Sequence, residues 1–83
     1  MTKPEIYELI CNRLQEAGRA KGAPTVPINS ETAILGGQLA VDSLDLAGIV
    51  VELESLTGKD PFAGGFINFR TVGELTDLYA KPE

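Results

Sequence analysis

The chain has 83 residues and a formal net charge of −5, and its 43% hydrophobic and 23% charged residues are ordinary for a globular protein. A chain of this length forms one domain, residues 1–83, and has no room for a second core. The acidic balance argues against nucleic acid and anionic membranes as partners, and no apolar run is long enough to span a bilayer.

The first helix is predicted to begin at Thr2. Glu5 stands three residues later, which is a capping-box pattern, and Pro4 is tolerated in a first helical turn. Apolar residues then recur at helical spacing, at Ile6, Leu9, Ile10, Leu14 and Ala17. Because glycine commonly follows the last turn of a helix, Gly18 is the expected stop.

A long connection is predicted from residue 19 to about residue 41. Its two prolines, Pro24 and Pro27, cannot lie inside a helix, and Gly36 and Gly37 interrupt any later one. The segment also contains apolar residues that a free linker would not need, namely Val26, Ile28, Ile34, Leu35 and Leu39. We therefore expect it to pack across the core, with a short turn after Asn29 and Ser30.

A second helix is predicted from Asp42 to about Thr57. Aspartate is a favoured N-cap, and Asp45 adds a second acid in the first turn, where negative charge is stabilising. Gly58 ends the helix. The following segment, to residue 70, is ambiguous, because its Gly-Gly pair at 64–65 limits any helix to a turn or two.

The last helix is predicted to open at Thr71, with Glu74 completing another capping box. Its core stripe consists of Val72, Leu75, Leu78 and Tyr79. No segment shows sustained alternation of apolar and polar residues, so a sheet is not expected. The predicted fold class is all-α: a small four-helix bundle, three helices long and one short, with a long first loop.

Catalytic and metal sites are not expected in this chain. It has no histidine, which removes the usual general base, the common nucleophile dyads and the commonest metal ligand. Cys11 lies among apolar residues of the first helix and is interpreted as a small core residue. A single cysteine and the lack of a signal-peptide pattern predict a cytoplasmic protein, which we expect to be monomeric.

Negative charge is concentrated around the second helix. Residues 42–60 contain five acids and only one basic residue, Lys59, a net charge of −4: Asp42, Asp45, Glu52, Glu54 and Asp60. This pattern favours basic protein partners, although a solvated helix face explains the charge alone equally well.

The second helix also has more apolar residues than one buried face needs. One stripe is the ordinary core face, with Leu56 near its edge: Leu46, Ile49, Val50 and Leu53. A second stripe points away from it: Leu44, Ala47 and Val51. A partly exposed apolar stripe flanked by acids is typical of a partner-docking helix, although the long connection could instead cover it.

Ser43 falls in the first turn of this helix. A phosphodiester on its hydroxyl would lie near free backbone N–H groups and the positive end of the helix dipole. The alternative is that Asp42 and Ser43 are only a capping pair.

Taken together, these residues resemble the phosphopantetheine-binding carrier family, which comprises acyl carrier proteins and related peptidyl carriers. The resemblance runs from about Glu5 to Tyr79 and centres on residues 39–45, Leu-Ala-Val-Asp-Ser-Leu-Asp, which are similar to the family's Leu-Gly-x-Asp-Ser-Leu attachment motif. The Ile-Val-Val-Glu-Leu-Glu run at 49–54 and Thr-Val-Gly-Glu-Leu at 71–75 support it.

The resemblance implies that Ser43 carries 4′-phosphopantetheine, attached from coenzyme A by a phosphopantetheinyl transferase that uses magnesium. It implies that Asp42 helps to present Ser43. It also implies docking of partner enzymes, such as a ligase, an acyltransferase or a ketosynthase, on Leu44, Asp45, Ala47, Val51 and Glu52. Weak docking guided by charge suits a carrier that must leave each partner quickly.

Departures from the family pattern favour a specialised carrier over central fatty-acid synthesis. Ala40 stands where the motif has glycine, and Gly48 stands where fatty-acid carriers commonly have an acid. Two alternatives stay open. One is a carrier of aminoacyl or peptidyl groups, and the other is an unmodified helical adaptor that binds a partner through its second helix.

Overall fold

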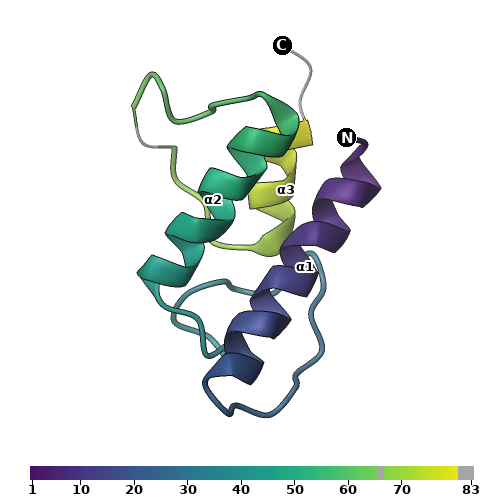
Figure 1. Ribbon diagram of the computed structural model, residues 1–83, viewed down its shortest axis with the longest axis vertical. Helices are drawn as coiled ribbons and strands as arrows, with labels where there is room; N and C mark the ends of the chain where they lie inside the picture. Colours follow the sequence, from purple (N-terminus) through teal and green to yellow (C-terminus); the bar gives the residue numbers. More distant parts are fainter. Residues whose placement is uncertain (66, 81–83) are drawn as a thin grey trace.

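The computed structural model describes residues 1–65 and 67–80, and within this part of the chain it has three helices and no strand. Helix α1 spans Lys3–Ala20, α2 spans Ser43–Thr57 and α3 spans Val72–Ala80. In Figure 1, α1 runs in the opposite direction to α2 and α3, so its end lies beside the start of α2. The predicted all-α class is confirmed.

The short fourth helix is not confirmed. Residues 60–65 form turns, in which the Ala63 N–H donates to the Asp60 carbonyl (3.2 Å) and the Gly65 N–H donates to the Phe62 carbonyl (3.0 Å). Phe66, which falls in the same predicted segment, lies outside the described residues. The Gly-Gly pair favours turns here because glycine loses more conformational freedom in a helix than other residues do.

The predicted start of α1 is confirmed, but its predicted stop is wrong. Thr2 and Glu5 form the expected reciprocal capping box. The helix passes through Gly18 and continues to Ala20. Lys21 is the C-cap, and Gly22 follows it with φ 75°, a left-handed conformation that glycine adopts without steric cost.

The boundaries predicted for α2 and the start predicted for α3 are confirmed. Asp42 is the N-cap of α2, and Gly58 ends the helix in the left-handed conformation. The Thr71 hydroxyl accepts a hydrogen bond from the Glu74 N–H (3.1 Å), and the Glu74 carboxylate accepts one from the Thr71 N–H (3.1 Å). These local signals in the sequence were sufficient because each cap satisfies helix-end groups within four residues.

The long first connection packs against the core, as predicted, and its backbone is hydrogen-bonded to the start of α3. The N–H of Ile34 donates to the Arg70 carbonyl (2.9 Å), and that of Val72 to the Thr32 carbonyl (3.0 Å). The expected turn after Asn29 is present, since the Thr32 N–H donates to the Asn29 carbonyl (3.1 Å). Ile34 becomes part of the core, with 1% of its surface exposed.

Gly73 is required where this connection meets α3. Its N–H donates to the Ser30 carbonyl (2.8 Å), and a Cβ at Gly73 would lie 2.9 Å from the same oxygen.

We predict that Gly73→Ala lowers the free energy of unfolding by about 1–3 kcal/mol, because the two segments must separate. Chemical denaturation measures this, with Gly18→Ala as the control. Gly18 has open space around it and lies inside α1, so its replacement should stabilise the fold by about 0.5–1 kcal/mol. A neutral Gly73→Ala would contradict the close packing described here.

The core joins all three helices and the first connection. Among the described residues, ten buried apolar side chains form it: Ile6, Ile10, Leu14, Ile34, Val41, Ile49, Leu53, Val72, Leu75 and Tyr79. Tyr79 is the largest of them and is 1% exposed, yet its hydroxyl has no hydrogen-bond partner among the described residues. Burial, together with the negative charges of Glu54 and Asp60, raises the pKa of Tyr79 to about 12.

Tyr79→Phe is predicted to leave the fold as stable as before or to stabilise it by up to about 1 kcal/mol, because a buried unpaired hydroxyl costs free energy. The wild-type protein should also lose stability between about pH 10 and pH 12, because the unfolded chain ionises Tyr79 at a lower pH than the folded chain does. Unfolding curves at pH 7 and across this alkaline range measure both effects. If Tyr79→Phe destabilises the protein at pH 7, the hydroxyl has a partner and this description is wrong.

Candidate attachment site and docking face

Ser43 is the first residue of α2 and is exposed. The cap before it is made without its hydroxyl. The Asp42 carboxylate accepts a hydrogen bond from the Asp45 N–H (2.9 Å), and the Asp45 carboxylate accepts one from the Asp42 N–H (3.2 Å). The Ser43 hydroxyl has no partner among the described residues, so it is not the second half of a capping pair.

Backbone donors surround this hydroxyl. The first N–H groups of any helix lack a partner within the helix, and here the cap and the first helical turn use those of Asp45 and Leu46. The N–H groups of Ser43 and Leu44 have no acceptor among the described residues. Together with the helix dipole, they favour an anionic group placed on Ser43.

A depression of about 330 Å³ lies directly beside Ser43. Its walls are mostly apolar and come from the first connection, from α2 and from the segment before α3: Ile34, Leu35, Leu46 and Phe69. Arg70 also lines it and brings a positive charge to the side of the site. No pattern in the sequence predicts this depression, because residues from two irregular segments form much of it and share no periodicity.

The outward face of α2 is mostly apolar and carries no charge. Leu44 is 80% exposed and Val51 is 66% exposed, so the second stripe is not covered by the long connection. Leu56, expected near the edge of the core face, is 53% exposed instead. Within α2 the exposed positions are all uncharged: Ser43, Leu44, Ala47, Gly48, Val51, Ser55 and Leu56. We call this set the exposed face of α2.

Asp45, expected at a docking site, is bound within the chain. The Lys21 ammonium, just after α1, donates to the Asp45 carboxylate and to the Ala40 carbonyl (2.9 Å), and it lies 3.7 Å from the Asp42 carboxylate. The hydrogen bond from Lys21 lowers the pKa of Asp45 below its usual value. Lys21 therefore ties the end of α1 to the segment that holds Ser43.

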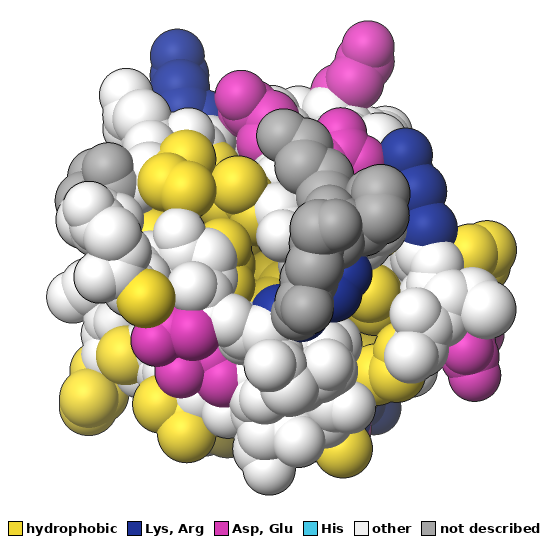
Figure 2. Space-filling model, turned by 90° about the horizontal axis from the view of Figure 1, so that it is seen from above, with side chains coloured by type: hydrophobic (Ala, Val, Ile, Leu, Met, Phe, Trp, Pro, Cys, Tyr) yellow, Lys and Arg dark blue, Asp and Glu magenta, His cyan; other side chains and the backbone are white. Residues whose placement is uncertain are grey.

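Glu52, the other acid expected to contact partners, is also paired. Two nitrogens of the Arg13 guanidinium donate to its two carboxylate oxygens, at 2.8 and 2.7 Å. This bidentate pair lowers the pKa of the Glu52 carboxyl group. With Arg13 and Lys21 counted, the net charge of −4 over residues 42–60 falls to −2 around the helix. Charges of both signs are also interspersed around the end of the molecule that Figure 2 shows.

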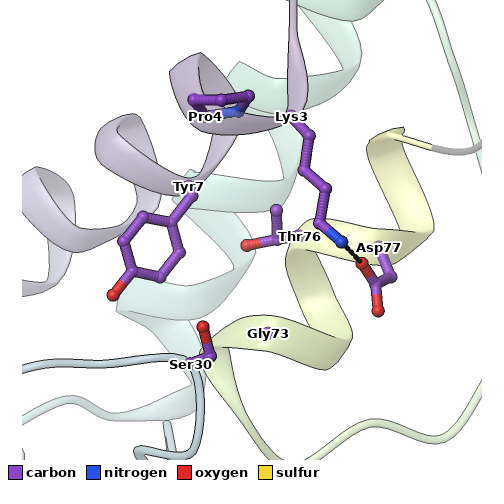
Figure 3. A pocket seen from close by; sticks show the side chains of 7 residues that line it. All are labelled: Lys3, Pro4, Tyr7, Ser30, Gly73, Thr76 and Asp77. Atoms are coloured by element: carbon purple, nitrogen blue, oxygen red, sulfur yellow. Dashed lines mark ion pairs between the residues drawn. The ribbon is translucent and has the colours of Figure 1, made fainter.

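A second depression, of about 430 Å³, lies between α1 and α3. In Figure 3, Tyr7 and Ser30 stand on one side of it, and the ion pair between Lys3 and Asp77 (2.9 Å) lies on the other. It contains none of the predicted site residues. Cys11 lies outside it and is half-buried against the core, and burial raises the pKa of its thiol, as expected for a packing residue.

The solution structure of MacpD, an acyl carrier protein from Pseudomonas fluorescens involved in mupirocin biosynthesis, superimposes on this chain with a TM-score of 0.74. The two chains are 28% identical, and the match covers 95% of this chain and 71% of MacpD. The resemblance to acyl carrier proteins predicted from the sequence is therefore confirmed.

By sequence comparison, no model of a known protein family and no curated protein matches the chain. Among the helices described here, none is both long enough and apolar enough to cross a bilayer.

Proposed function

We propose that this chain is a carrier protein that holds a 4′-phosphopantetheine arm on Ser43 and presents acyl intermediates to biosynthetic enzymes. The observation that carries the proposal is the exposed, unpaired hydroxyl of Ser43 at the first residue of α2. When bound, the arm supplies a terminal thiol that holds the cargo as a thioester. The chain itself needs no catalytic group, because the partner enzymes perform the chemistry.

The residues around Ser43 suit this group. Its phosphodiester would accept hydrogen bonds from the free N–H groups of Ser43 and Leu44, and Arg70 in the neighbouring depression would oppose its charge. Transfer from coenzyme A would form a bond from Ser43 Oγ to the phosphorus of the pantetheine phosphate, break the pyrophosphate bond and release adenosine 3′,5′-bisphosphate. The hydroxyl proton would leave to the magnesium-dependent transferase or to solvent.

The apolar walls beside Ser43 support an acyl cargo over an aminoacyl one. An acyl chain can lie against Ile34 and Phe69 without losing a solvated charge, whereas a free amino group would have to be desolvated there. MacpD takes part in mupirocin biosynthesis, and this likeness supports a specialised pathway over central fatty-acid synthesis. The partners in this proposal are the transferase and acyl-loading and acyl-processing enzymes.

Intact-protein mass spectrometry tests the proposal. Folded wild-type protein is incubated with coenzyme A, magnesium and a broad-specificity phosphopantetheinyl transferase, with an unrelated acyl carrier protein modified in parallel. A mass gain of one phosphopantetheine per chain is expected. No gain, while the parallel carrier is modified, would favour the unmodified adaptor instead.

The class of cargo is tested on the modified protein. Short-chain and medium-chain acyl groups should be transferred to the arm by acyl-loading enzymes and released by hydroxylamine, which cleaves thioesters. Loading by amino-acid-activating enzymes alone would show that the chain is an aminoacyl carrier and that the apolar depression does not select the cargo.

A further inference from the structure

We propose that Arg13 and Lys21 determine which partners this chain accepts, by occupying the carboxylates that flank the exposed face of α2. This inference rests on the proposed function, since it concerns the enzymes that act at Ser43. It adds a role for two residues of the α1 side of the molecule, which the docking residues predicted from the sequence did not include.

The charged residues of α2 lie at the edges of its exposed face. Every exposed position of α2 is uncharged, and its acids Asp45, Glu52 and Glu54 are only partly exposed, at the edges of that face. A partner that approaches Ser43 over this face therefore meets Leu44 and Val51 first.

Two of those acids are already paired with cations of the same chain. Glu52 has both oxygens bound by Arg13, and Asp45 is bound by Lys21 and by the N–H of Asp42. A lysine or arginine of a partner would have to displace a cation that is already in place. The attraction between this helix and a basic docking site is weakened accordingly, because each pair presents almost no net charge at a distance.

Apolar contact remains as the basis on which a partner recognises this face. Asp45 and Glu52 are neutralised by their cations, and Glu54 is only partly exposed at the edge of the face. The apolar contact area of Leu44, Val51 and Leu56 therefore carries the docking. The partner that fits is an enzyme with an apolar docking patch beside its active-site entrance. Enzymes that select carriers through a cluster of basic residues are disfavoured, which would separate this carrier from more acidic ones.

The experiment measures kcat/KM for phosphopantetheine transfer at several salt concentrations. The transferase is one whose rate with an unrelated acyl carrier protein falls as salt is raised, so that its docking site is known to be basic. Wild type is compared with Arg13→Gln, with Lys21→Gln and with the double variant. Lys3→Gln is the matched control. It also removes one positive charge from α1, but Lys3 pairs with Asp77 of α3 and not with an acid of α2.

Wild type should show a low rate that depends little on salt. Arg13→Gln should raise kcat/KM at low salt about two- to fivefold and the double variant about tenfold, with a steep fall as salt is added. Lys3→Gln should leave the rate close to that of wild type. The helicity and the unfolding midpoint of each variant are measured in parallel. If Lys21→Gln disturbs the fold by removing the contact with Ala40, the rate of Arg13→Gln alone tests the inference.

Two results would overturn the inference. One is an unchanged or lower rate for folded Arg13→Gln, and the other is an equal rise for Lys3→Gln, which would reflect net charge alone. Either result leaves the proposed function intact as long as wild type is modified. A wild type that is never modified would overturn the proposed function itself.

Discussion

Replacing Ser43 by alanine is expected to abolish phosphopantetheine transfer, a loss of more than about a thousandfold in rate, because the acceptor oxygen is removed. The fold should be retained. Ser43 is exposed and the N-cap is made by Asp42 and Asp45, so the substitution should change the free energy of unfolding by about 0.5 kcal/mol or less. Intact-mass measurement and thermal unfolding test the two expectations together.

Ser55→Ala is the matched control for this variant. Ser55 lies on the exposed face of the same helix and loses the same hydroxyl, but it stands three turns further from the start of α2. It should be modified at the wild-type rate. If Ser43→Ala still gains the mass of one phosphopantetheine, another residue carries the arm and the assignment of Ser43 is wrong.

For a transferase with an apolar docking patch, Val51→Asp is expected to lower kcat/KM for transfer at least about tenfold, which corresponds to about 1.4 kcal/mol of lost interaction. Val51 is 66% exposed at the centre of the exposed face of α2, so the substitution adds a charge that a partner's apolar patch would have to desolvate. The isolated protein should be almost as stable as wild type, since the side chain is not in the core.

Asn12→Asp controls for the added charge, because Asn12 is an exposed residue of α1. It should reduce the rate much less than Val51→Asp does. Equal losses in the two variants would indicate a general charge effect, and no loss in Val51→Asp would show that partners do not use this face. A protein that is modified normally but loses partner binding in Val51→Asp alone would fit an adaptor that also carries an arm.

The helix boundaries that depend on local signals were predictable from the sequence. The starts of α2 and α3 follow from capping boxes of four residues, at Asp42–Asp45 and Thr71–Glu74. The end of α1 was not predictable in the same way. Gly18 and Gly22 are both plausible stops by residue type, and only the backbone conformation shows that Gly22 is the one in the left-handed region.

The site was predicted only in part, for a related reason. Ser43 and the exposed stripe of Leu44 and Val51 follow from positions on one helix, which periodicity reveals. The ion pairs join residues far apart in the sequence: Arg13 and Glu52 are 39 residues apart, and Lys21 and Asp45 are 24 apart. Their pairing depends on how α1 packs beside α2, which no local pattern in the sequence specifies.

Attachment at Ser43 is tested most directly by fragmentation mass spectrometry of the peptide that contains this residue, taken from protein treated with coenzyme A and transferase. We predict one phosphopantetheine on this peptide, with the added mass located on Ser43 and released as pantetheine on fragmentation. An unmodified Ser43 peptide from folded protein, or an arm located on any other residue, would contradict the central claim that α2 presents Ser43 for attachment.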